Sequence, residues 1–295
     1  MDWLTTFPRM NDASLTALKR AIDEWFRGFT RAYGDGIEAF FEPLQYFLIQ
    51  VERLLMATPW FIVLVVVAAV AWFASRSLKI VLGSVVTLLL IGYFGMWEDT
   101  MRTISMIVVC TIVAILLGIP IGIAMARSRH VEGFVSPILD VMQTMPSFVY
   151  LIPVVMLLGI GKVPGLIAVV IYAIPPIIRL TNLGIKLVDS DVLEAADAFG
   201  SSNMQKLRNV QLPLAIPTIM SGVNQTIMAA LSMVVIASMI GVQGLGQPVL
   251  RAISNQYFTL GVFNGLAIVG IAIVFDRVSQ AFGRRLQKHR EVVHG

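Results

Sequence analysis

The chain has 295 residues, of which 57% are hydrophobic and 14% are charged, and its mean hydropathy is +0.81. Soluble domains carry about 25% charged residues, so this composition excludes an ordinary soluble enzyme or binding module and indicates an integral membrane protein. The formal net charge of +4 is spread over several loops between apolar runs. It therefore reflects membrane topology and does not predict binding to nucleic acid.

The segment 1–53 has the pattern of amphipathic helices. Apolar residues recur at helical spacing in 37–55, with polar side chains on the opposite face, and 15–29 predicts a second helix upstream. We expect Pro43 to kink the first of these helices because proline cannot donate a backbone hydrogen bond. The predicted location is the outer membrane interface. Because 53 residues precede the first apolar run, we expect no cleaved signal peptide.

Seven uncharged apolar runs follow, each near or beyond the ~20 residues that a helix needs to cross the hydrocarbon. They cover 54–75, 80–97, 103–126, 141–161, 163–178, 209–250 and 252–275. Runs of this length suit helices and not the short alternating strands of a membrane barrel. We therefore predict an all-α integral membrane protein with about seven transmembrane helices in a domain at 54–283, followed by a basic cytoplasmic tail at 284–295.

The basic residues predict the orientation of the chain. If the loop 179–211 is cytoplasmic, the inside segments hold thirteen Lys and Arg residues, whereas the short outside loops hold only Arg102, Lys162 and Arg251. Because cytoplasmic loops carry an excess of Lys and Arg, this distribution places the N-terminus outside and the C-terminus inside.

The loop 187–211 contains two predicted helix starts and one predicted stop. Asp191, with Glu194 three residues later, fits an N-cap and its reciprocating acid. Gly200 suits the left-handed turn that ends a helix, and Ser202 with Gln205 offers a second capping pair. The loop is therefore predicted to be two short helices joined by a glycine hinge.

This loop resembles the EAA motif of the permease subunits of ABC importers. The matching residues are Glu194, Ala195, Ala196, Gly200, Leu212 and Pro213, with Val210 where isoleucine is usual. The two alanines expose little side chain, so a partner surface can approach the helix closely. The resemblance implies that the loop is the coupling helix, which docks into a groove of a separate ATPase subunit.

Four further segments resemble the permeases for glycine betaine, proline betaine and related quaternary ammonium solutes. They are QTMPSFVYLIP at 143–153, and 174–185, 212–241 and 244–253. The resemblance implies the fold of a type I ABC importer permease in the bacterial cytoplasmic (inner) membrane, surrounded by lipid. It also implies two ATPase subunits, an extracytoplasmic substrate-binding protein and a second permease copy, usually in a homodimer. Choline, carnitine, trimethylamine N-oxide or an amino acid such as histidine remain alternative substrates.

The sequence contains no nucleotide site of its own. GIGK at 159–162 looks like the end of a phosphate-binding loop, but Met156 stands where the opening glycine belongs and Val163 replaces the Ser or Thr. The three histidines lack the spacing of metal ligands. We therefore predict a transport subunit that is not an enzyme and binds no cofactor or metal, with ATP and Mg on the partner ATPase.

Two other classes of membrane protein are weighed against this interpretation. A secondary transporter should show inverted repeats and ionisable residues in the middle of its spans. Neither is evident, because Asp140 lies close to a predicted boundary and Arg179 at a predicted helix end. A membrane enzyme would need a cluster of acids, bases or nucleophiles, which the sequence does not display.

Polar, aromatic and kinked positions within the spans are candidates for the translocation path. They are Thr144, Pro146, Ser147, Phe148, Tyr150, Asn224, Gln225, Met228 and Ser232. Pro146 breaks helical hydrogen bonds and could form part of a gate. The aromatic rings could contact a quaternary ammonium group or serve core packing. Likewise, Asn224 and Gln225 could flank a stripe facing the path or hydrogen-bond to neighbouring helices.

Overall fold

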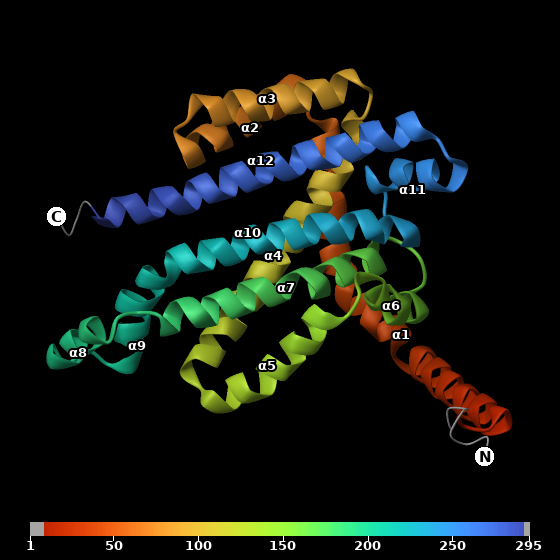
Figure 1. Ribbon diagram of the computed structural model, residues 1–295, viewed down its shortest axis with the longest axis horizontal. Coiled ribbons are helices and arrows are strands. Elements are labelled where there is room, and N and C mark those ends of the chain that lie inside the picture. The colour runs from red at the N-terminus through yellow and green to blue at the C-terminus, as the bar shows by residue number, and fades with distance from the viewer. Residues whose placement is uncertain (1–8, 292–295) are drawn as a thin grey trace, which may run out of the picture.

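The computed structural model describes residues 9–291, with side chains to residue 285, and every regular element in that range is a helix (Figure 1). The prediction of an all-α fold is confirmed. The α-helices are α1 (Asp12–Ala57), α2 (Trp60–Ser75), α3 (Leu78–Tyr93), α4 (Trp97–Arg127), α5 (Arg129–Thr144), α6 (Leu151–Leu158), α7 (Lys162–Lys186), α8 (Ser190–Ala198), α9 (Asn203–Gln205), α10 (Leu212–Ala237), α11 (Gly246–Asn255) and α12 (Phe258–Glu291).

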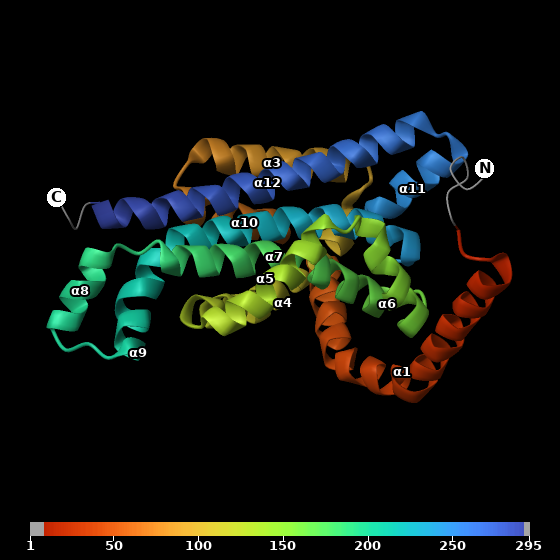
Figure 2. The same cartoon turned by 60° about the horizontal axis from the view of Figure 1, so that its bottom comes forward.

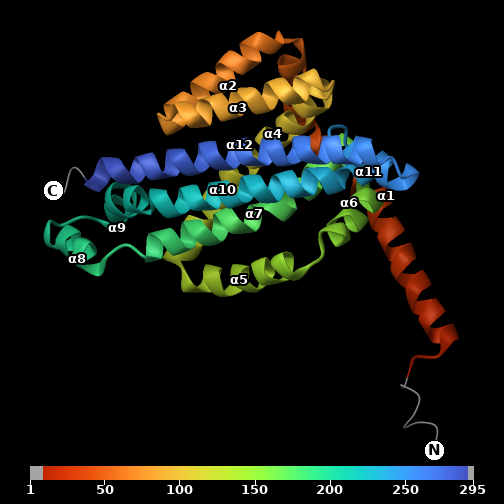
Figure 3. The ribbon, with the colours of Figure 1, turned by 45° about the horizontal axis from the view of Figure 1, so that its top comes forward.

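The bundle is built around α7, which packs against α4 on one side and α10 on the other. Helix α12 lies against α10, and the hairpin of α2 and α3 packs on α12 (Figure 3). Figure 1 shows α8, α9 and the C-terminal end of α12 at one end of the bundle, and α6 and α11 at the other. The loop predicted to couple to a partner therefore projects from the same end as the C-terminus.

Four helices are long and apolar enough to cross a membrane: α4, α7, α12 and the continuous helical run of residues 203–240 that contains α10. Two bent pairs pass the same test together, α1 with α2 at 110° and α5 with α6 at 113°. Helix α3 is apolar but has only 16 residues. Length and composition thus support four to six spans, so the number seven stays a prediction.

Two of the predicted apolar runs are interrupted in the structure. The run 141–161 is divided where α5 ends at Thr144 and a short 3₁₀ turn begins at Ser147, because Pro146 cannot continue a helix. The run 209–250 contains α10, a 3₁₀ turn at Ser238–Ile240, a bend at Gly241 and then α11. Gly241 has φ +88°, which ends the helical path there.

The two predicted N-terminal helices form one continuous helix, α1, with Pro43 inside it. Figure 2 shows that α1 bends into two arms, so the expectation of separate helices is wrong although a change of direction is present. The second arm packs on the bundle: Leu48 is 2% exposed, and Glu52 pairs with Lys162 at 2.6 Å. The first arm leaves the apolar side chains of Leu18 and Trp25 exposed, as an interfacial helix would.

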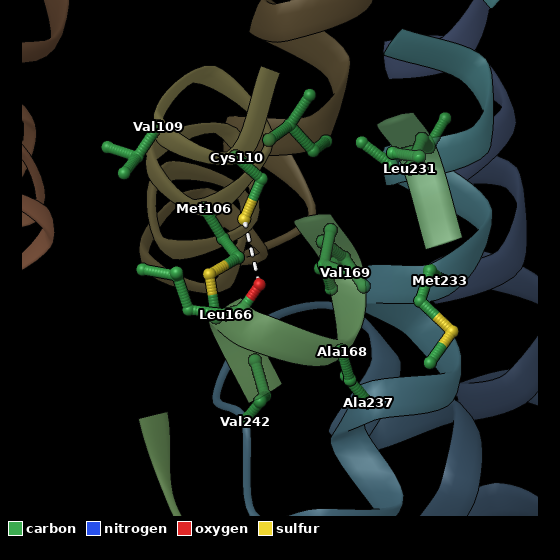
Figure 4. Packing of buried hydrophobic residues seen from close by; sticks show 14 of the residues in the cluster. Met106, Val109, Cys110, Leu166, Ala168, Val169, Leu231, Met233, Ala237 and Val242 are labelled. Atoms are coloured by element: carbon green, nitrogen blue, oxygen red, sulfur yellow. Dashed lines mark hydrogen bonds between the residues drawn. The ribbon is translucent and has the colours of Figure 1, made fainter. Parts of the chain in front are cut away.

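The largest hydrophobic core lies where α4, α7 and α10 meet (Figure 4). Cys110 is fully buried there, and its thiol lies 3.9 Å from the backbone oxygen of Leu166. Val169 of α7 and Met233 of α10 are also fully buried. Within the described residues Cys110 is a free thiol that fills core space.

Gly122 lets the backbone of α4 pack closely against α7. A Cβ added to Gly122 would lie 2.6 Å from Cβ of Thr181 and 2.7 Å from the backbone oxygen of Ile178, closer than such atoms can approach. In a membrane, lipid is as apolar as leucine, so helices associate mainly through close packing of this kind. The contact therefore positions α7, which carries much of the site described below.

We predict that Gly122→Ala lowers the free energy of unfolding by about 1–3 kcal/mol, because α4 and α7 must separate to admit the methyl group. The matched control is Gly83→Ala in α3, where an added Cβ meets nothing within 4 Å. Alanine favours helix there, so the control should be unchanged or stabilised by up to about 1 kcal/mol. Thermal unfolding in detergent measures both, and equal shifts would contradict the packing argument.

Candidate functional site

The loop predicted to couple to an ATPase is built much as its sequence suggests, with one shift of position. The N-cap of α8 is Asp189, whose carboxylate accepts a hydrogen bond of 2.9 Å from the amide of Asp191. The prediction of Asp191 as the cap is wrong, because Asp191 already lies in the first helical turn. Its negative charge there interacts favourably with the helix dipole. Gly200 has φ +75°, which confirms the left-handed turn after α8.

The second capping pair is confirmed. The amide of Ser202 donates to Gln205 Oε1 at 2.8 Å, and the amide of Gln205 donates to Ser202 Oγ at 3.4 Å. A π-helical turn at Lys206–Gln211 then leads directly into α10, which starts at Leu212 and Pro213. The loop is thus connected to α10 without a flexible linker.

Helix α8 stands away from the bundle and buries none of its residues. Glu194 and Ala195 are exposed, and Ala196 is half-buried. Phe199 at the end of α8 is 91% exposed, a feature that sequence reasoning missed. An exposed helix with two alanines, an acid and a free aromatic ring is suited to insertion into a groove on another protein.

The break between α5 and α6 gathers five of the predicted path residues. Thr144 donates to the backbone oxygen of Val141 at 3.0 Å, Pro146 is exposed and Ser147 is half-buried. The two aromatic residues differ in environment. Tyr150 is 6% exposed, its hydroxyl donates to the backbone oxygen of Met142, and its ring packs edge-on against Tyr172. Phe148 is 52% exposed, so it is the ring available to a passing solute.

Helix α10 separates its polar residues into a packed side and an exposed side. Asn224 donates to Asp276 Oδ1 of α12 at 3.1 Å and accepts from the hydroxyl of Ser279. Gln225, one residue later, is exposed, as is Ser232, while Met228 is half-buried. The structure therefore gives Asn224 the helix-joining contacts and leaves Gln225 and Ser232 on an open face.

Helices α5 and α7 carry two acid–base pairs that sequence reasoning did not assemble. Arg179 Nη2 donates to Asp140, and Lys186 Nζ lies 2.5 Å from Glu132 Oε1, which also accepts from Asn182 at 3.1 Å. We call Glu132, Asp140, Arg179 and Lys186 the charge face. The acids are eight residues apart and the bases seven, so each set lies on one side of its helix. The spacing of the acids on one helix and of the bases on the next is the sequence feature that could have predicted these pairs.

Glu132, Arg179 and Lys186 of the charge face line two neighbouring clefts, and Asp140 lies beside them through its contact with Arg179. One of about 420 Å³ is lined by residues of α4, α5 and α7 and by Gln225 of α10; the other, of about 610 Å³, opens toward Arg127 and Arg129. Glu132 and Ser136 line both clefts. Asp140 lies eleven residues beyond the start of α5 at Arg129, about 16 Å along the helix axis. Its location close to a membrane boundary stays a prediction.

The fold and this set of features define a multi-pass membrane permease with a projecting loop. Residues 118–288 match the family model described as the binding-protein-dependent transport system inner membrane component. The chain belongs to this family, a family of transport permease subunits of the inner membrane. The predicted resemblance to ABC importer permeases is thereby confirmed.

Two relatives match most of the chain. The glycine betaine/proline betaine transport system permease protein ProW of Escherichia coli is 44% identical over 96% of this chain and 82% of its own length. The glycine betaine/carnitine transport permease protein GbuB of Listeria monocytogenes is 47% identical over 78% of this chain and 82% of its own. A solved inward-facing structure of the MetNI methionine ABC transporter shares the fold, with a TM-score of 0.57, 20% identity and coverage of 63% of this chain and 93% of that one.

We predict that two neighbouring substitutions on α10 have different effects. Asn224→Ala removes a bond to Asp276 and leaves Ser279 without its side-chain acceptor, so the free energy of unfolding should fall by about 0.5–2 kcal/mol. Gln225→Ala removes an exposed side chain and should leave unfolding unchanged. Thermal unfolding of both variants in detergent distinguishes them, and a larger loss in Gln225→Ala would reverse the assignment.

Proposed function

We propose that this chain is the permease subunit of an ABC importer that moves glycine betaine, or a closely related quaternary ammonium zwitterion, into the cell. The substrate class rests on the full-length similarity to permeases named for glycine betaine. The observation that carries the mechanism is the unbroken helical path from α9, through the π turn, to α10 and its exposed Gln225. The projecting helix α8 is tied to the π turn by the ion pair between Asp197 and Lys206.

The docking surface for the ATPase is assigned to α8 and the residues that follow it. They are Glu194, Ala195, Ala196, Gly200, Leu212 and Pro213. The exposed ring of Phe199 extends this surface. One such loop per chain means one docked ATPase, so two permease copies with two ATPase subunits form the complete importer. ATP and Mg are held by the ATPase subunits, and this chain binds no cofactor.

The translocation path is assigned to the open faces of α5, α7 and α10. Asp140 is 64% exposed and Arg179 38% exposed at the side chain; Arg179 lies in the candidate span α7, and Asp140 lies in α5, which passes the same test together with α6. Charged groups facing lipid are expensive, so such residues border a water-filled path or a neighbouring chain. A second copy of this permease, in a homodimer, would close the path on that side, with Phe148 and Ser232 on the same lining.

The N-terminus is placed outside and the C-terminus inside. The end of the bundle that carries α8 and α9 also carries the turn after α2, with Arg76 and Lys79, and the end of α4, with Arg127. Cytoplasmic ends attract Lys and Arg, so this end faces the ATPase. A substrate-binding protein would deliver solute at the opposite end, formed by α6, α11 and the second arm of α1.

Transport follows from linkage between the two ends. ATP draws the ATPase subunits together and moves the docked α8 helices, and the rigid connection transmits this movement to α10. Inward and outward openings alternate only if ATP and the loaded binding protein favour a different state from ADP and the empty one. Choline, carnitine, trimethylamine N-oxide or histidine remain alternative substrates of the same architecture.

The function is tested by ATP hydrolysis of this chain reconstituted in lipid with the ATPase encoded beside it. The binding protein is added after loading with glycine betaine, choline, carnitine, trimethylamine N-oxide or histidine. We expect the betaine-loaded protein to stimulate hydrolysis most. If only binding protein loaded with another solute stimulates hydrolysis, that solute replaces glycine betaine as the proposed substrate. If the chain does not assemble with an ATPase, the proposal is overturned.

We predict that Gly200→Val reduces ATP-driven uptake. A β-branched residue resists φ +75° at a cost of roughly 1–2 kcal/mol, which disturbs the turn between α8 and α9. An added Cβ meets nothing within 4 Å, so the effect comes from the backbone alone. Gly83→Val on the helix α3, where an added Cβ also meets nothing within 4 Å, is the control for added bulk away from the clefts. Uptake into proteoliposomes measures both, and full uptake in Gly200→Val would contradict the role of the hinge.

A further inference from the structure

We infer that the charge face of α5 and α7 is a zwitterion-selective contact site for the solute, so that the permease itself discriminates against net cations. The inference rests on the proposed function and adds a site to it. The residues are Glu132, Asp140, Arg179 and Lys186, arranged as two acid–base pairs along antiparallel helices.

The first step of the argument is that this lining has no net charge of its own. Each acid is satisfied by one base, in the pairs Asp140–Arg179 and Glu132–Lys186. A solute with one positive and one negative group can exchange partners with such a pair, its ammonium group beside Asp140 and its carboxylate beside Arg179. No charge is then left without a partner, which is the condition for placing ions at membrane depth.

A solute with a net positive charge leaves one charged side chain of the same pair without a partner. Its trimethylammonium group could approach Asp140, but Arg179 would lose its partner and receive none in return. The pair is partly exposed, so the loss is smaller than in a buried ion pair, but the charge of Arg179 is still left without a partner. The wider cleft adds Arg127 and Arg129 near its mouth, and these charges repel a cation further. The lining therefore disfavours choline while admitting glycine betaine.

The site also has hydrogen-bonding capacity that the protein does not use. Among the described residues, Arg179 Nε and Asn182 Oδ1 are buried without a hydrogen-bond partner. The guanidinium group of Arg179 has five donors and engages Asp140 through Nη2. A planar guanidinium can hold a carboxylate through two parallel bonds, which suits it to the carboxylate end of a betaine.

Ser136 provides the position for a direct test. It is half-buried, lies four residues from both Glu132 and Asp140, and lines both clefts. The native thiol of Cys110 is fully buried, so a cysteine at residue 136 would be the reactive one in the described part of the chain. Ser77, at the turn between α2 and α3, is also half-buried and lies away from these clefts, so Ser77→Cys is the control.

The experiment measures the rate at which a charged methanethiosulfonate reagent labels Ser136→Cys in the lipid-reconstituted permease–ATPase complex. Glycine betaine and choline are titrated as competing probes, because both carry the trimethylammonium group and only the first has a carboxylate. Protection scales as 1 + [L]/Kd, so about threefold slower labelling is expected with glycine betaine at roughly twice its Kd. Choline at that concentration should slow labelling less, and neither solute should protect Ser77→Cys.

Substitutions of Arg179 separate a binding role from a structural one. In Ser136→Cys with Arg179→Gln, protection by glycine betaine should disappear and protection by choline should increase, because Asp140 has lost its partner. Arg179→Lys should keep part of the preference for betaine. If the pair only holds α5 on α7, Arg179→Gln would alter labelling without any solute and would leave the ratio between the two solutes unchanged.

Equal protection by both solutes, no protection, or unchanged protection in Arg179→Gln would overturn the inference. These outcomes are distinguishable from failure of the proposed function. Stimulation of the ATPase by betaine-loaded binding protein, without protection of residue 136, would contradict the contact site and leave the proposed function standing. Protection by glycine betaine over choline, without such stimulation, would support the site and contradict the proposed activation by a betaine-loaded binding protein.

Discussion

Close packing of α7 between α4 and α10 is the constraint from which the other features follow. On α4, Gly122 leaves no room for a side chain against α7, and on α7 a Cβ at Gly184 would lie 2.9 Å from Cβ of Thr218 in α10. Lipid offers no hydrophobic drive for helices to associate, so this intimate contact holds the bundle together. With two sides of α7 occupied, its charged side is left open, and Arg179 and Lys186 find their partners on α5.

The same constraint divides polar residues between structure and path. On α10, Asn224 points to α12 and joins Asp276 and Ser279, whereas Gln225 lies in the cleft beside the charge face. Successive helix positions differ by about 100°, so one residue changes the environment completely. A polar residue within a span is therefore informative only once its neighbours are known.

In the proposed mechanism, the loop 187–211 and α10 move together. The capping box at Ser202 and the π turn that follows give α9 and α10 a continuous hydrogen-bonded backbone. In the proposed mechanism, movement at α8 passes the turn at Gly200 to α9 and then reaches Gln225 along this continuous helix. Within the described residues, the side chain of Lys206 also ties the π turn to Asp197 of α8 at 2.6 Å, so the two short helices keep a defined relation to each other.

The sequence by itself determined the helical fold class, the membrane location, the left-handed turn at Gly200 and the capping box at Ser202. Each of these depends on composition or on residues a few positions apart. Only the tertiary structure decided that the N-terminal helix is continuous, that Asp189 caps α8 and that Glu132 pairs with Lys186, 54 residues away. Pairing across helices depends on their packing and rotation, which the close contact of α7 with its neighbours sets and which no local pattern encodes.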